Sequence, residues 1–70
     1  SQHTKGEALD FVCEDMKTAF EIIREHLSFD QLIWERGDSN QPRWIHVSFK
    51  RAGKNRGEVL RYNGKSYKPF

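Results

Sequence analysis

Three side chains in the sequence form a candidate set of metal ligands. His3 and Asp10 lie seven positions apart with Gly6 between them, and glycine permits a sharp turn that would aim both side chains at one point. His46 supplies a second imidazole from a segment with the alternation of a strand. A single strand histidine is more often structural than a ligand, but two imidazoles and one carboxylate together suit zinc. Three protein ligands leave a fourth position for water, which is typical of a catalytic zinc site.

The opening residues also match a known pattern. Ser1-x-His3-x-x-Gly6-x-Ala8-x-Asp10 resembles the SxHxxGxAxD signature of zinc D-alanyl-D-alanine carboxypeptidases and dipeptidases. Relatives of that family include phage endolysin peptidases.

Two later segments, Phe29–Glu35 and Trp44–Phe49, resemble the phage and bacterial branch of the same family. The resemblance therefore covers about residues 1–50, in the correct order. The hedgehog signalling domain shares the zinc scaffold more distantly, so a shared fold would not by itself establish peptidase activity.

The resemblance implies that His3, Asp10 and His46 hold one zinc ion (Zn2+), and that a zinc-bound water attacks a peptide carbonyl. It also implies a nearby carboxylate that acts as general base, and Glu35 is our candidate. Antiparallel pairing could bring Glu35, at the end of the strand before that of His46, beside the imidazole. The competing interpretation is an exposed strand-end carboxylate, and Asp38 is the weaker alternative for the base.

The chain departs from the family pattern in two places. Many members carry the base three positions before the last ligand, where this sequence has Arg43. The family's substrate-binding arginine precedes the first motif, and this sequence begins inside that motif at Ser1. We therefore expect residues 1–70 to be a single zinc peptidase-like domain that lacks its N-terminal part. Arg43 is a candidate for substrate binding in place of the missing arginine. Trp44 and Ser48 are candidates for contacting substrate or packing around the metal.

Hydrophobic periodicity indicates one helix and several strands. Met16, Ala19, Phe20, Ile23 and Leu27 form one apolar stripe on a helix. Short alternating runs separated by turn residues predict strands that form an antiparallel sheet, and Asn63-Gly64 predicts a two-residue hairpin turn. The expected fold is α+β, a small antiparallel sheet packed on one amphipathic helix, with the zinc site on the sheet face. The expected elements are a strand at Glu7–Cys13, a helix at about Asp15–Leu27, and strands at Gln31–Glu35, Arg43–Phe49, Glu58–Tyr62 and within Lys65–Phe70.

Charge is distributed unevenly along the sequence. Residues 1–42 contain four basic and nine acidic side chains, whereas residues 43–70 contain eight basic ones and a single acidic one. A basic half suggests a polyanionic partner or a solvated surface. Basic residues interleaved with aromatic ones could also bind single-stranded nucleic acid, but that alternative leaves the His3–Asp10 spacing unexplained. A zinc-stapled domain without activity is the third possibility.

A domain of 70 residues often needs a disulfide or a bound metal ion for stability. Cys13 is the only cysteine, so a disulfide within the chain is excluded. The sequence has no membrane span or signal-peptide pattern. We expect a monomer that acts on a peptidoglycan peptide, with neither a membrane nor nucleic acid as partner. The expected location is the bacterial cell envelope, either the periplasm or the wall, which a phage-encoded protein would reach at lysis.

Overall fold

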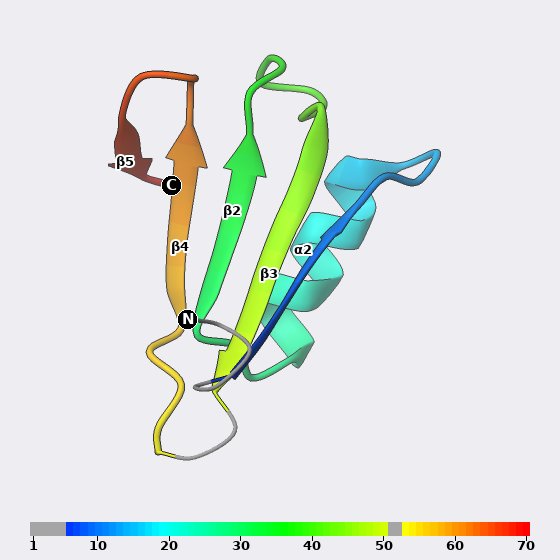
Figure 1. Cartoon of the computed structure of the whole chain (residues 1–70). Coiled ribbons are helices and arrows are strands. Elements are labelled where there is room, and N and C mark those ends of the chain that lie inside the picture. Colours follow the sequence, from blue (N-terminus) through cyan, green and yellow to red (C-terminus); the bar gives the residue numbers. More distant parts are fainter. Residues whose placement is uncertain (1–5, 51–52) are drawn as a thin grey trace.

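The computed structural model describes residues 6–50 and 53–70, which form a five-stranded sheet with a helix on one side (Figure 1). The α+β fold predicted from the sequence is confirmed. The one helix in these residues is neither long nor apolar enough to cross a membrane. The elements in chain order are β1 (Gly6–Phe11), α2 (Met16–His26), β2 (Gln31–Glu35), β3 (Trp44–Lys50), β4 (Glu58–Tyr62) and β5 (Tyr67–Pro69).

The strands are arranged in the order β1-β3-β2-β4-β5, and all neighbouring pairs are antiparallel except β2 and β4, which are parallel. The prediction of an antiparallel sheet is wrong for this one pair. Both edges of β3 are already occupied, by β1 and β2, and the chain that leaves β3 joins the sheet beyond β2. It turns back as it does so, and β4 therefore runs opposite to β3 and alongside β2.

Helix α2 begins and ends where the apolar stripe predicts. Asp15 is its N-cap, and the carboxylate accepts hydrogen bonds from the Thr18 backbone N–H at 3.2 Å and from the Thr18 hydroxyl at 2.8 Å. This satisfies one of the amide groups that the first turn leaves without a partner. Leu27 is the C-cap and is 51% exposed, so the buried part of the stripe ends before it.

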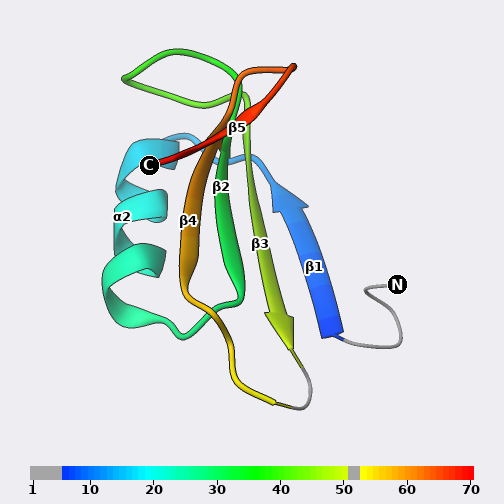
Figure 2. The ribbon, with the colours of Figure 1, turned by 90° about the vertical axis from the view of Figure 1, so that its left-hand side faces the viewer.

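The hydrophobic core lies between α2 and one face of the sheet (Figure 2). Phe20 is fully buried and meets the Trp34 ring edge-on, with 5.1 Å between the ring centroids. Phe70 from the end of the chain contacts both rings, at 4.8 Å and 5.6 Å. Alternation along the strands puts every second side chain into this core, so the intervening side chains lie on the face away from α2.

Two predicted boundaries need correction. β1 ends at Phe11 rather than Cys13, and Val12 is 69% exposed. The turn between β4 and β5 spans four residues rather than two, since Tyr62 pairs with Tyr67. The side chain of Asn63 accepts hydrogen bonds from the backbone N–H groups of residues 65 and 66, at 2.8 Å and 2.9 Å. These bonds stabilise the wider turn.

An ion pair between a buried carboxylate and a half-exposed arginine joins the start of β2 to the segment that leads into β4. Asp30 is 4% exposed and accepts hydrogen bonds at 2.9 Å from both Nε and Nη2 of Arg56. The Arg56 backbone N–H donates to the same carboxylate at 3.1 Å, and Lys50 Nζ lies 3.7 Å from it. The fork of two parallel bonds is the strong geometry for an arginine–carboxylate pair.

We expect Asp30→Asn to destabilise the fold at neutral pH and progressively less in acid. The hydrogen bonds from Arg56 hold the pKa of Asp30 well below its ordinary value. The stability that this carboxylate contributes is therefore present above its unfolded-state pKa and is lost as the pH falls. Urea denaturation of the wild type and the variant should give midpoints that differ at pH 7 and approach each other as the pH falls below about 5. The exposed Glu14→Gln is the control, and a constant gap at all pH values would contradict the prediction.

Candidate metal and catalytic centre

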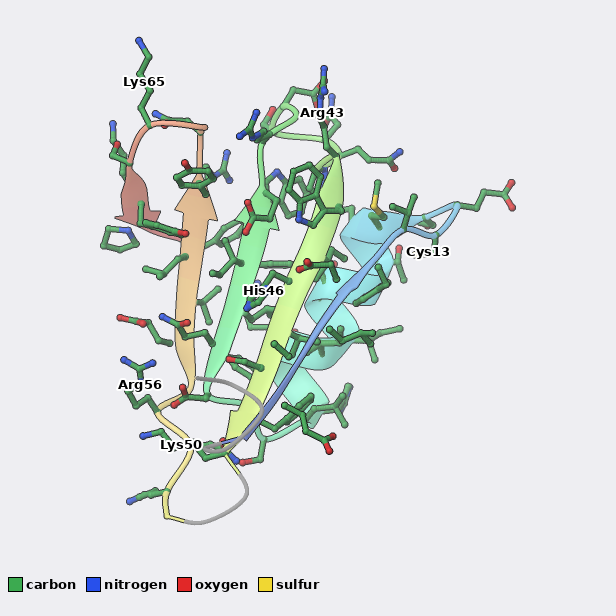
Figure 3. The ribbon with its side chains drawn as sticks, in the orientation of Figure 1. Cys13, Arg43, His46, Lys50, Arg56 and Lys65 are labelled. Carbon is green, nitrogen blue, oxygen red and sulfur yellow. The ribbon has the colours of Figure 1, made fainter. Side chains whose placement is uncertain are left out.

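The sheet face that points away from α2 carries the candidate site. His46 lies on this face near the middle of β3, as Figure 3 shows. Cross-strand pairing arranges the side chains of the face in three rows, because residues opposite each other in register point to the same side. The rows are Ala8, Ser48, Gln31 and Glu58, then Asp10, His46, Ile33 and Leu60, then Trp44, Glu35 and Tyr62.

Asp10 and His46 are in direct contact. They are partners in the β1–β3 register, and His46 Nδ1 lies 2.7 Å from Asp10 Oδ1. The His46 side chain is 22% exposed and that of Asp10 is 64% exposed. One imidazole nitrogen and one carboxylate oxygen therefore converge at a point that solvent can reach.

The pair fits a zinc site in its chemistry and its spacing. Neutral imidazole and carboxylate are both common zinc ligands, and two ligand atoms of one tetrahedral zinc ion lie about 3.3 Å apart. The observed contact of 2.7 Å would need to open by less than an ångström. The third predicted ligand, His3, lies outside the described residues. Within residues 6–50 and 53–70, no group of three His, Cys, Asp or Glu side chains is placed to hold a metal.

Glu35, the predicted general base, is buried close to this pair. Glu35 pairs with Trp44, which lies two residues before His46 on β3. The Glu35 residue is only 8% exposed. Burial raises the pKa of Glu35 above its ordinary value. His46 lowers the pKa, Asp10 raises it and Arg36 lowers it, in decreasing order of effect. These couplings put Glu35 within electrostatic reach of both candidate ligands. A carboxylate with a perturbed pKa beside a histidine is a common feature of active sites.

Arg36 is a member of the site that the sequence analysis did not identify. Its guanidinium carbon lies 5.8 Å from the ring centroids of both Trp44 and Tyr62. These two rings come from the strands on either side of Glu35, so Arg36 lies over the end of the row that contains the carboxylate. Arg36 has a φ of 56°, an uncommon conformation for a residue with a side chain. The sequence contains no marker of this conformation beyond the turn-rich loop that follows.

The three predicted substrate-contacting residues have different surroundings. Arg43 is exposed at the end of the sheet (Figure 3), and its backbone N–H donates to the carbonyl of Glu35 at 2.8 Å. Trp44 is partly buried under Arg36. Ser48 is 1% exposed, and its hydroxyl accepts a hydrogen bond from the Gln31 backbone N–H at 3.2 Å. The Ser48 hydroxyl is thus committed to joining β3 and β2.

We expect Glu35→Gln to make the metal-free protein more stable at neutral pH. Because burial raises the folded-state pKa of Glu35, its favourable contribution is present below the unfolded-state pKa. That contribution is lost as the pH rises through the folded-state value. Glutamine keeps the shape and never ionises, so the urea midpoint of the variant should exceed that of the wild type at pH 7. The two midpoints should converge near pH 4. Glu21→Gln on the exposed side of α2 is the matched control, and a variant that is less stable at pH 7 would refute this account.

The described residues thus bring two predicted ligands and the predicted base together on one open face. Arg36 and two aromatic rings cover the base at the end of the strands. No family model, curated protein or solved structure matches this chain.

Proposed function

We propose that this chain is a zinc-dependent peptidase that hydrolyses stem peptides of peptidoglycan. One observation carries the proposal: the Asp10–His46 contact lies in the strand-register row next to that of a buried carboxylate, Glu35. A pair of zinc-type ligands beside a buried base is the arrangement that metal-assisted hydrolysis requires. The resemblance of residues 1–10 to the SxHxxGxAxD signature supports the same reaction class.

Each candidate residue has a role in the proposed reaction. Asp10 and His46 would hold the metal together with His3. Zinc, when bound, supplies the Lewis acid that polarises a peptide carbonyl and activates water. A carboxylate oxygen of Glu35 takes the proton of the attacking water and returns it to the leaving amine. Burial raises the pKa of Glu35 toward the pH at which it must both accept and release this proton.

The basic second half of the chain suits this substrate. Residues 43–70 carry eight basic side chains and one acidic one, and wall polymers and the carboxylates of stem peptides are anionic. Attraction between opposite charges raises the rate at which such partners meet. We place the protein at the bacterial cell envelope, made by the bacterium itself or by a phage.

Binding of single-stranded nucleic acid remains the competing proposal, and the packing of the aromatic residues favours it less. Such binding needs free ring faces on which bases can stack. The rings of Tyr62 and Tyr67 pack against each other at a tilt of 32°, with 4.5 Å between their centroids. The ring of Phe70 lies under Arg61, with the guanidinium carbon 4.6 Å from its centroid. Each of these rings therefore has a partner on one side within the chain, while Tyr67 is 56% and Phe70 43% exposed.

Metal analysis with two variants tests the proposal. We expect the purified wild type to bind about one zinc per chain, and His46→Ala to remove both the zinc and the hydrolysis of a D-Ala-containing stem peptide. His26→Ala is the matched control, because the His26 side chain is 70% exposed on α2, away from the site. It should keep both properties.

Two other outcomes would each reject part of the proposal. A wild type that stays folded without metal and gains nothing from added zinc would reject the metal site. A wild type that binds zinc at His46 but cleaves no stem peptide would instead indicate a zinc-stapled domain without activity. Oligonucleotide binding that survives removal of the metal would favour the nucleic-acid alternative.

A further inference from the structure

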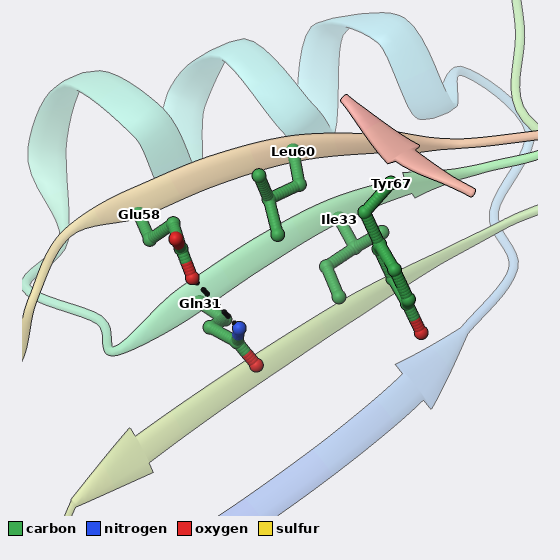
Figure 4. Close-up of a pocket in the computed structure, with 5 residues that line it drawn as sticks. All are labelled: Gln31, Ile33, Glu58, Leu60 and Tyr67. Carbon is green, nitrogen blue, oxygen red and sulfur yellow. Dashed lines mark hydrogen bonds between the residues drawn. The ribbon is translucent and has the colours of Figure 1, made fainter. Parts of the chain in front are cut away.

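A pocket of about 410 Å³ lies on the open face of the sheet, directly beside the candidate centre (Figure 4). Ile33 connects the two, because it pairs with His46 on one side and with Leu60 on the other. The lining comes from three strands, β2, β4 and β5, and consists of Gln31, Ile33, Glu58, Leu60 and Tyr67.

The walls of the pocket divide into an apolar part and a polar end. Ile33 and Leu60 form the apolar floor, and Tyr67 extends from β5 toward Ile33 (Figure 4). The ring of Tyr67 packs against that of Tyr62, with 4.5 Å between the centroids and a tilt of 32°. This part of the pocket suits a hydrocarbon chain, since it offers apolar surface on several sides.

The polar end offers hydrogen-bond acceptors. The amide nitrogen of Gln31 donates to Glu58 Oε1 at 2.8 Å. A carboxylate can only accept, so this bond fixes which end of the Gln31 amide is the nitrogen. The amide oxygen of Gln31 therefore points away from this bond, and the second carboxylate oxygen of Glu58 lies at the other end of the pair (Figure 4). A ligand group bound here must supply hydrogen-bond donors.

Charge and distance make the ligand more specific. Arg56 Nη1 lies 3.7 Å from Glu58, but the Nε and Nη2 groups of the same guanidinium bond Asp30, so Arg56 is shared between two carboxylates. The polar end lies two residues along the strands from Ile33 and Leu60, a distance of about 6.7 Å. A side chain with a four-carbon stem and a terminal ammonium group spans this distance and brings three donors.

We propose that this pocket is a subsite for a lysine side chain, or that of another diamino acid with a similar stem, in a peptide bound across the centre. The stem lies on Ile33 and Leu60, and the ammonium group donates to the carboxylate of Glu58. The inference rests on the proposed function, because the side chain that fills the pocket belongs to the peptide substrate.

Binding of two small probes to the zinc-loaded chain tests the subsite without requiring activity. The probes are N-acetyl-lysine methylamide and N-acetyl-norleucine methylamide, which differ in the ammonium group. We expect the lysine probe to shift the methyl NMR signals of Ile33 and Leu60 and to bind about three- to tenfold more tightly than the norleucine probe. Glu58→Gln keeps an acceptor for Gln31 but loses the charge, and should remove that preference. Glu25→Gln, exposed on α2, is the matched control and should leave it unchanged.

Hydrolysis of two stem peptides that carry lysine or norleucine separates failure of the subsite from failure of the proposed function. Cleavage of both peptides at equal rates, or equal binding of the two probes to the wild type, overturns the subsite and leaves the peptidase intact. Selective binding of the lysine probe without cleavage of either peptide supports the subsite and rejects the peptidase. Signal shifts confined to other residues also overturn the subsite. The comparison of probes on the wild type does not depend on the folding of any variant.

Discussion

Glu35→Gln is expected to lower peptide hydrolysis by about 10²- to 10⁴-fold while one zinc per chain stays bound. The buried carboxylate lies within electrostatic reach of Asp10 and His46, and the proposal assigns it the proton transfer rather than metal binding. Glutamine has nearly the same shape and cannot accept that proton. Zinc analysis and the initial rate of stem-peptide cleavage, measured on the same preparation, check both halves of the prediction.

The same substitution should raise the stability of the metal-free protein at neutral pH, as argued above. A gain in stability together with a loss of activity is expected where a residue is retained for chemistry rather than for folding. Glu21→Gln should change neither property. Full activity in Glu35→Gln would move the base to another residue, and loss of zinc would make Glu35 a ligand.

The face on which the candidate residues lie could be predicted from the sequence, because alternation along a strand has a fixed period of two. That period put Glu35 with Ile33 and put His46 opposite Ile45 and Val47. The structure places Leu32, Trp34, Ile45 and Val47 in the core. The helix could also be predicted from the sequence, since its apolar stripe and its Asp15 cap are local signals.

The surroundings of the site could not be predicted, because they depend on contacts between distant segments. The Asp10–His46 pairing requires β1 to join the outer edge of β3, and no local signal marks which edge a strand will choose. Tyr62 lies beside Glu35 because β4 pairs with β2 in this register. The Asp30–Arg56 pair joins residues 26 positions apart. Each of these contacts is a consequence of strand order rather than of composition.

Phe20→Ala is expected to cost about 3–5 kcal/mol of folding free energy. Phe20 has no exposed surface, and it is the helix residue whose ring meets both Trp34 and Phe70. A chain of 70 residues has a total stability of about 4–10 kcal/mol at typical values per residue. The substitution should therefore leave the metal-free protein partly or wholly unfolded, as circular dichroism and urea denaturation would show.

Added zinc should partly restore the fold of Phe20→Ala, because a ligand that binds only the folded state stabilises it. The rescue should disappear in the double variant with His46→Ala, since the metal then loses a ligand. Ile22→Ala is the matched control, because Ile22 lies on the same helix but is 52% exposed, and it should cost less than about 1 kcal/mol. Rescue that persists without His46 would show that zinc binds elsewhere. If zinc fails to rescue Phe20→Ala although the wild type binds it, metal binding and the packing of α2 are not coupled through the sheet.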